Sequence, residues 1–129
     1  MQLAFEKMGG LIPAVIQDCR NGDVLMLGFL NEQALAETQR TGEIHFFSRS
    51  RNKLWKKGET SGHVLRVQEV RIDCDADALL IRVEPLGPGV CHEGYQSCFF
   101  RQLDASGATR VIAERTFDTK DVYGKEGVE

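Results

Sequence analysis

The amino-acid sequence predicts an α+β fold that is strand-rich, with a mixed or antiparallel sheet and one or two short helices. Its length of 129 residues fits a single domain. With 42% hydrophobic and 27% charged residues, the composition can bury a core, and it excludes a disordered chain, a coiled coil and a collagen-like fibre. Short apolar runs separated by turn residues recur along the chain, a pattern typical of strands.

The chain begins with a predicted β-hairpin. Two apolar runs, at residues 11–17 and 23–29, flank Asn21 and Gly22. This pair of residues readily adopts the positive φ angles of a tight hairpin turn. We therefore expect two antiparallel strands joined at this point.

A short amphipathic helix is predicted next. Asn31 can cap its first turn, and the helix should continue to about residue 40 before Gly42 ends it. Leu30 and Leu35 occupy the two positions of a hydrophobic staple, which fixes the direction in which the chain enters the helix.

The middle of the chain predicts strands interrupted by one loop. Alternating apolar residues indicate a strand over residues 43–48. Residues 48–62 are polar, basic and glycine-bearing around one Trp, so we expect a loop there. Two further strands, over residues 63–74 and 79–84, are joined by a turn at residues 75–77 and predict a second hairpin.

The last part of the chain predicts less regular structure. Residues 98–103 should be extended, and residues 109–117 should form another strand or a terminal helix. Residues 118–129 are charged and have little to bury. We therefore expect a single domain over residues 1–117, followed by a frayed tail.

Charge and cysteine content indicate a cytoplasmic protein. The 16 basic and 19 acidic residues give a net charge of −3, so no overall basic field would recruit nucleic acid or an anionic membrane. No apolar run is long enough to span a membrane, and the start, MQLAFEKMGG, lacks the pattern of a signal peptide. In the reducing cytoplasm, clustered thiols more often bind metal or react than form disulfides.

Three of the four cysteines suggest a zinc site. A loop after the second hairpin could bring Cys91 and Cys98 near Cys74, and three thiolates would leave one coordination position of zinc open to water. The alternative is three small buried hydrophobic residues, because free Cys is often buried. His92 could close the site as a fourth ligand, but an acid/base role suits it better because it directly follows Cys91.

Three aspartates suggest a second cation site. Asp73, Asp75 and Asp77 alternate along the chain, so an extended backbone would project their carboxylates to one side. Their mutual repulsion is relieved by a hard cation such as Mg²⁺ or Ca²⁺. The alternative is an acidic hairpin turn. In a regular strand Cys74 would point away from these carboxylates, which places the two metals on opposite sides of the backbone.

The basic loop suggests a phosphate site. Guanidinium, ammonium, hydroxyl and amide donors together suit phosphate, and Trp55 could stack on a base. The alternative is a solvated loop with Trp55 tucked into the core. The candidate residues for substrate or phosphate binding are Ser48, Arg49, Ser50, Arg51, Lys53, Trp55, Lys56, Lys57, Glu59, Thr60 and Ser61.

Three long strings carry a resemblance to a known family. They are GLIPAVIQDCRNGDVLMLGFLNEQAL, HFFSRSRNKLWKKGETSG and RIDCDADALLIRVEPLGPGVCHEGYQSCFF. Together they resemble the phosphoribosyl-AMP cyclohydrolases of histidine biosynthesis, over roughly residues 9–101. The resemblance implies a hydrolase that opens the adenine ring of phosphoribosyl-AMP between N1 and C6.

The resemblance also implies the roles of individual residues. Cys74, Cys91 and Cys98 correspond to the family's zinc ligands, and the three aspartates to its magnesium ligands. The resemblance further implies a homodimer in which both subunits supply zinc ligands. Glu93, where the family pattern usually has Thr, and one extra residue before Cys91 depart from that pattern.

A non-catalytic zinc-binding module for nucleotides or RNA is the alternative to an enzyme. It would use the same thiols and the same basic loop. The net negative charge argues against a nucleic-acid surface, and three thiolates without an obvious fourth ligand argue against a closed structural zinc site.

Overall fold

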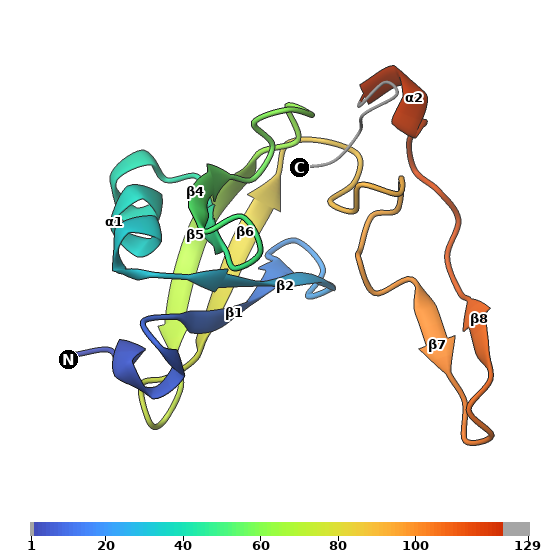
Figure 1. The fold of residues 1–129 in the computed structure, drawn as a ribbon. Helices are drawn as coiled ribbons and strands as arrows, with labels where there is room; N and C mark the ends of the chain where they lie inside the picture. The colour runs from blue at the N-terminus through green and yellow to red at the C-terminus, as the bar shows by residue number, and fades with distance from the viewer. Residues whose placement is uncertain (1, 123–129) are drawn as a thin grey trace.

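A four-stranded mixed sheet forms the centre of the molecule. The computed structural model describes residues 2–122, and Figure 1 shows their arrangement. The strand order is β2-β1-β6-β5, with β1 parallel to β6 and the other neighbouring pairs antiparallel. These strands are β1 (Ile12–Asp18), β2 (Val24–Leu30), β5 (Leu65–Ile72) and β6 (Leu79–Pro85). The predicted strand-rich α+β fold with a mixed sheet is confirmed.

The predicted N-terminal hairpin is confirmed, but its connection is longer than a tight turn. Along β1, buried residues alternate with half-buried ones, so Ile12, Ala14 and Ile16 lie in the core. Strand β1 ends at residue 18 and β2 begins at residue 24, which leaves five residues between them. Gly22 adopts a positive φ of 83°, and the Asn21 side chain accepts a hydrogen bond from the Asp23 amide.

The helix α1 (Glu32–Thr41) follows its predicted signals. The Asn31 side chain accepts a hydrogen bond of 2.8 Å from the Ala34 amide, as an N-cap should. Gly42 ends the helix with a left-handed φ of 74°, which residues with a Cβ rarely adopt. Leu30 is buried and Leu35 packs against the same core, which is the arrangement that the predicted staple requires.

The prediction of a loop over residues 48–62 is wrong in its middle. Strand β4 (Lys53–Lys56) pairs antiparallel with β3 (His45–Ser48). The rings of Phe46 and Trp55 lie opposite each other in this pair, 5.2 Å between centroids. Packing of Leu54 and Trp55 against the core outweighs the charge of the flanking lysines, which is why composition alone predicted a loop.

The second predicted hairpin is confirmed, with a shorter first strand. Strands β5 and β6 pair antiparallel, but β5 ends at Ile72, so residues 73–78 form the connecting turn. Leu79, Ile81 and Val83 of β6 are buried at the centre of the sheet. The aspartates therefore lie on a turn and not on a strand.

The C-terminal part extends away from the sheet. Strands β7 (Arg101–Leu103) and β8 (Thr109–Val111) form a hairpin whose residues are all exposed, and Figure 1 shows it standing apart from the body. The predicted extended segment thus begins three residues late, and a strand occupies part of residues 109–117. A four-residue helix, α2 (Thr119–Val122), lies in the predicted tail, whose residues 123–129 are outside those described. Within residues 2–122, no helix has the length and apolar character needed to cross a membrane.

Candidate functional site

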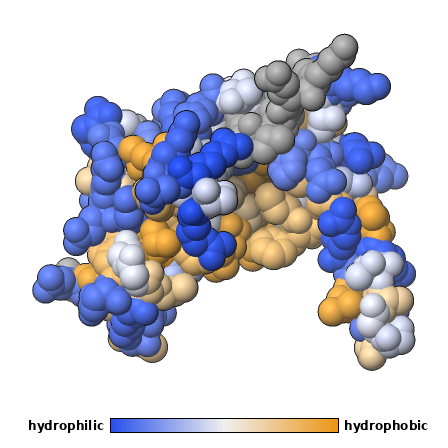
Figure 2. Space-filling view, viewed as in Figure 1, coloured by the Kyte–Doolittle hydropathy of each residue, from blue (hydrophilic) through white to orange (hydrophobic). Residues whose placement is uncertain are grey.

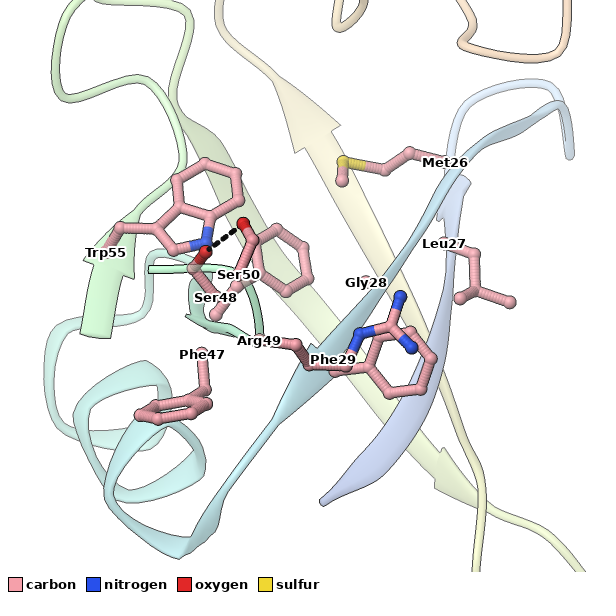
Figure 3. Close-up of a pocket in the computed structure, with 10 residues that line it drawn as sticks. Met26, Leu27, Gly28, Phe29, Phe47, Ser48, Arg49, Ser50 and Trp55 are labelled. Carbon is pink, nitrogen blue, oxygen red and sulfur yellow. Dashed lines mark hydrogen bonds between the residues drawn. The ribbon is translucent and has the colours of Figure 1, made fainter. Parts of the chain in front are cut away.

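A pocket of about 550 Å³ opens between β2 and the β3–β4 hairpin (Figure 3). Its lining combines apolar and aromatic residues with three polar ones, of which Arg49 and Ser50 are exposed and lie at the rim. The lining residues are Met26, Leu27, Gly28, Phe29, Phe46, Phe47, Ser48, Arg49, Ser50 and Trp55. The predicted substrate residues Ser48, Arg49, Ser50 and Trp55 thus meet at one pocket.

Gly28 allows the floor of this pocket to form. A Cβ atom at this position would overlap the Phe46 ring, so only glycine lets the ring lie directly against β2. Phe46 is 1% exposed and supports the half-buried Trp55 ring, which supplies the accessible aromatic surface of the cavity. Such surface suits a flat heteroaromatic ligand.

Arg49 is held at the rim by an aromatic ring. Its guanidinium lies 3.9 Å from the centroid of the Phe29 ring, a cation–π contact that orders the side chain. The hydroxyls of Ser48 and Ser50 lie 3.3 Å apart beside it, and Ser48 Oγ accepts a hydrogen bond from the Arg51 amide. The rim therefore offers a cation and hydroxyls together, which suits phosphate.

The other candidates of the predicted loop lie elsewhere. Arg51 and Lys53 are exposed and do not line the pocket, and Lys56 forms an ion pair with Glu43. Lys57 is 5% exposed, with its Nζ 5.8 Å from the Trp55 ring centroid. Glu59 and Thr60 are exposed, and Ser61 is half-buried.

Cys91 and Cys98 lie side by side beyond the C-terminal end of β6. Cys91 is 3% exposed, and its sulfur accepts a hydrogen bond of 3.4 Å from the Glu93 amide. The Cys98 amide donates to the Leu25 carbonyl oxygen at 2.7 Å, which ties this thiol to the start of β2. In the same segment, the rings of Tyr95 and Phe100 stack on each other and stabilise the loop that carries both cysteines.

The electrostatics of this thiol pair reflect close packing. The Cys98 residue as a whole is exposed, but its thiol is surrounded by neighbouring groups. This burial of the thiol is the largest cause that raises its pKa to about 11. The Cys91 sulfur raises this pKa further, and the Lys57 ammonium opposes both effects. Two adjacent sulfur donors are chemically suited to zinc. His92 directly follows Cys91 and is exposed.

The three aspartates meet on the β5–β6 turn. Each offers an oxygen atom, and these atoms lie within 4.8 Å of one another, so the predicted clustering is confirmed. Its cause is the turn, in which Ala76 adopts a positive φ of 61°, and not the extended backbone that we expected. Three carboxylates at this spacing suit a hard cation such as Mg²⁺.

Lys7 approaches the same carboxylates from the N-terminal 3₁₀ helix η1 (Phe5–Met8). Its Nζ lies 3.3 Å from Asp77 Oδ2 and 3.7 Å from Asp75 Oδ2, and the hydrogen bond to Asp77 is the main cause that raises the Lys7 pKa. No sequence pattern pointed to Lys7, because the contact joins residues 70 positions apart.

Cys74 lies on the acidic turn, away from the thiol pair. The seven residues of β6, which separate the turn from the Cys91 segment, span about 20 Å. Within residues 2–122, the only group of three potential metal-ligating side chains is that of the aspartates. One chain therefore brings Cys91 and Cys98 together but leaves Cys74 at the opposite end of the sheet.

The family model for phosphoribosyl-AMP cyclohydrolase matches residues 26–100, a stretch that includes the pocket, the aspartates and the cysteine pair. The phosphoribosyl-AMP cyclohydrolase of Solibacter usitatus is 56% identical over 124 residues, 96% of this chain and 98% of that protein.

Two further relatives carry the same name. The one from Methanosarcina acetivorans is 54% identical over 88% of this chain and 91% of its own length. The one from Pelotomaculum thermopropionicum is 53% identical over 90% of this chain and 89% of its own length. Matches of this extent show common descent over nearly the whole chain, and the chain belongs to the phosphoribosyl-AMP cyclohydrolase family.

Proposed function

We propose that this protein hydrolyses phosphoribosyl-AMP in histidine biosynthesis. Water adds to C6 of the adenine ring, the N1–C6 bond breaks, and N1 takes up a proton while C6 becomes a carboxamide carbon. The product is the phosphoribosyl-formimino carboxamide ribonucleotide. The observation that carries this proposal is a family match that spans the pocket, the aspartates and the cysteine pair at once.

The pocket between β2 and β3 is the proposed place of the substrate. Trp55, backed by the buried Phe46 ring, can face the purine ring, and Arg49 at the rim can bind a phosphate. Because Arg49 is already ordered by Phe29, less conformational entropy is lost when it binds. Binding the substrate at its phosphate ends would fix the position of C6.

Zinc is the proposed cofactor at Cys91 and Cys98, with Cys74 of a second copy as the third ligand. Zinc with an open coordination position lowers the pKa of water toward ~7, which makes hydroxide available at neutral pH.

A homodimer is the proposed source of the second copy. Exposed apolar side chains support such an interface, among them Phe99, Leu103 and Ile112. Figure 2 shows apolar surface facing the hollow between the sheet and the β7–β8 hairpin.

His92 is the proposed acid/base. It directly follows Cys91, and its side chain is open to the surroundings, so it can reach a substrate bound beside the thiols. Its imidazole can take the proton from the attacking water and deliver it to N1.

Asp73, Asp75 and Asp77 are the proposed magnesium ligands, and the ion they hold would support the turn or bridge a substrate phosphate. We place the enzyme in the cytoplasm, where its thiols stay reduced.

The proposal is tested by incubating metal-analysed protein with phosphoribosyl-AMP. Ring opening changes the ultraviolet absorbance of the purine, and we expect this change in proportion to the zinc content. A zinc-loaded sample that leaves the absorbance unchanged would instead favour a non-catalytic zinc module.

A further inference from the structure

We infer that the Lys7 ammonium is a built-in counter-cation of the acidic turn, which a divalent cation must displace when it binds Asp73, Asp75 and Asp77. The inference rests on the magnesium site proposed above. It adds a residue outside that site which sets the affinity for the ion.

The ammonium and a divalent cation need the same oxygen atoms. Lys7 Nζ lies within hydrogen-bond distance of Asp77 Oδ2 and 3.7 Å from Asp75 Oδ2. All three carboxylates offer oxygens within 4.8 Å of one another, so a cation among them would lie close to the ammonium. Like charges at such a separation repel, and one cation must leave.

Asp73 has a different task from the other two aspartates. Its Oδ1 accepts hydrogen bonds from the Asp77 and Ala78 amides, at 3.0 and 3.2 Å. These bonds hold the turn closed and fix the direction of the Asp73 carboxylate. Asp75 and Asp77, which contact Lys7, are therefore the ligands that an incoming cation must take from the ammonium.

The N-terminal segment keeps Lys7 near the turn even when the ammonium is displaced. The Ala4 amide donates a hydrogen bond of 2.7 Å to the Ala76 carbonyl oxygen, and Leu3 and Phe5 pack against the core. The backbone is thus docked, while the Lys7 side chain is 46% exposed. The side chain can swing into solvent without unfolding its segment, and it can return when the cation leaves.

Binding of Mn²⁺ to the full chain, followed by electron paramagnetic resonance and competed with Mg²⁺, tests this inference. Lys7→Gln should bind Mn²⁺ about fivefold more tightly, because the competing charge is gone. Lys7→Arg keeps the charge and should bind like the unsubstituted protein. Lys120→Gln removes an exposed lysine far along the chain and is the matched control.

Side-chain resonances provide a readout that is independent of activity. Adding Mg²⁺ should shift the Lys7 CεH₂ signal of the unsubstituted protein toward that of a lysine in solvent as the ammonium leaves the carboxylates, and should leave the Lys120 CεH₂ signal unchanged.

Equal affinity of Lys7→Gln and the unsubstituted protein would overturn the inference, as would an equal gain in Lys120→Gln. Absence of Mn²⁺ binding in every variant would overturn it too. Ring opening by the same samples then shows whether the proposed hydrolase activity fails with it.

Discussion

The two ends of β6 carry two candidate metal sites that are built in different ways. At one end, the aspartates gather within a single turn, and a lysine from the same chain balances part of their charge. At the other end, Cys91 and Cys98 meet only because loop contacts tie them to each other and to β2. One chain thus gathers three carboxylate donors at the acidic end but only two thiols at the other, where the proposed third ligand comes from a second copy.

The largest expected effect is at the thiol end. Cys91→Ser should lose zinc and lower kcat by more than ~100-fold, because loss of a direct ligand exceeds the effect of losing an outer partner. Metal analysis and the absorbance assay measure both quantities. The control is Cys19→Ser, in the β1–β2 connection, which should keep both. Full turnover by Cys91→Ser would contradict the zinc-binding role of this thiol, and the two ends of β6 would then not differ in their importance for catalysis.

A smaller effect is expected at the acidic end. Asp75→Asn removes one of the carboxylates that contact Lys7 and should weaken Mg²⁺ binding by about tenfold while leaving zinc content unchanged. Calorimetric titration with Mg²⁺, beside zinc analysis of the same sample, separates the two sites. If the variant lost neither Mg²⁺ affinity nor activity, the aspartates would be an acidic turn and no more.

The smallest effect concerns stability at the thiol end of the sheet. Asp18, at the end of β1, is 0% exposed, and its hydrogen bonds with Arg20 are the main cause that lowers its pKa. A lowered folded-state pKa stabilises the fold above the unfolded value of about 4, and this stabilisation is lost as the pH falls through the folded value. We therefore expect the free energy of unfolding, measured with denaturant between about pH 2 and 6, to fall less at acid pH in Asp18→Asn than in the unsubstituted protein. Identical pH profiles would contradict this account of Asp18.

Local sequence signals predicted the parts of the fold that depend on neighbouring residues. Asn31 and Gly42 delimit α1 as expected, and the spacing of the aspartates indicated their cluster. The strand β4 escaped prediction because its pairing with β3 and the packing of Trp55 are tertiary contacts, whereas the surrounding charges are local.

The candidate site was predictable in its residues but not in its assembly. Ser48, Arg49 and Trp55 were identified from side-chain chemistry, but their meeting with Gly28 and Phe29 depends on how β2 faces the β3–β4 hairpin. The separation of Cys74 from Cys91 likewise follows from the course of β6, which spacing along the sequence does not reveal.

The central claim, that the thiol site is completed by a second copy, is tested most directly by mixing inactive variants. Cys74→Ser and Cys91→Ser would be unfolded and refolded together. Random pairing makes half of the dimers mixed, and each mixed dimer has one intact site of two, so about a quarter of the unsubstituted activity should return. Activity no higher than that of either variant alone would contradict the claim.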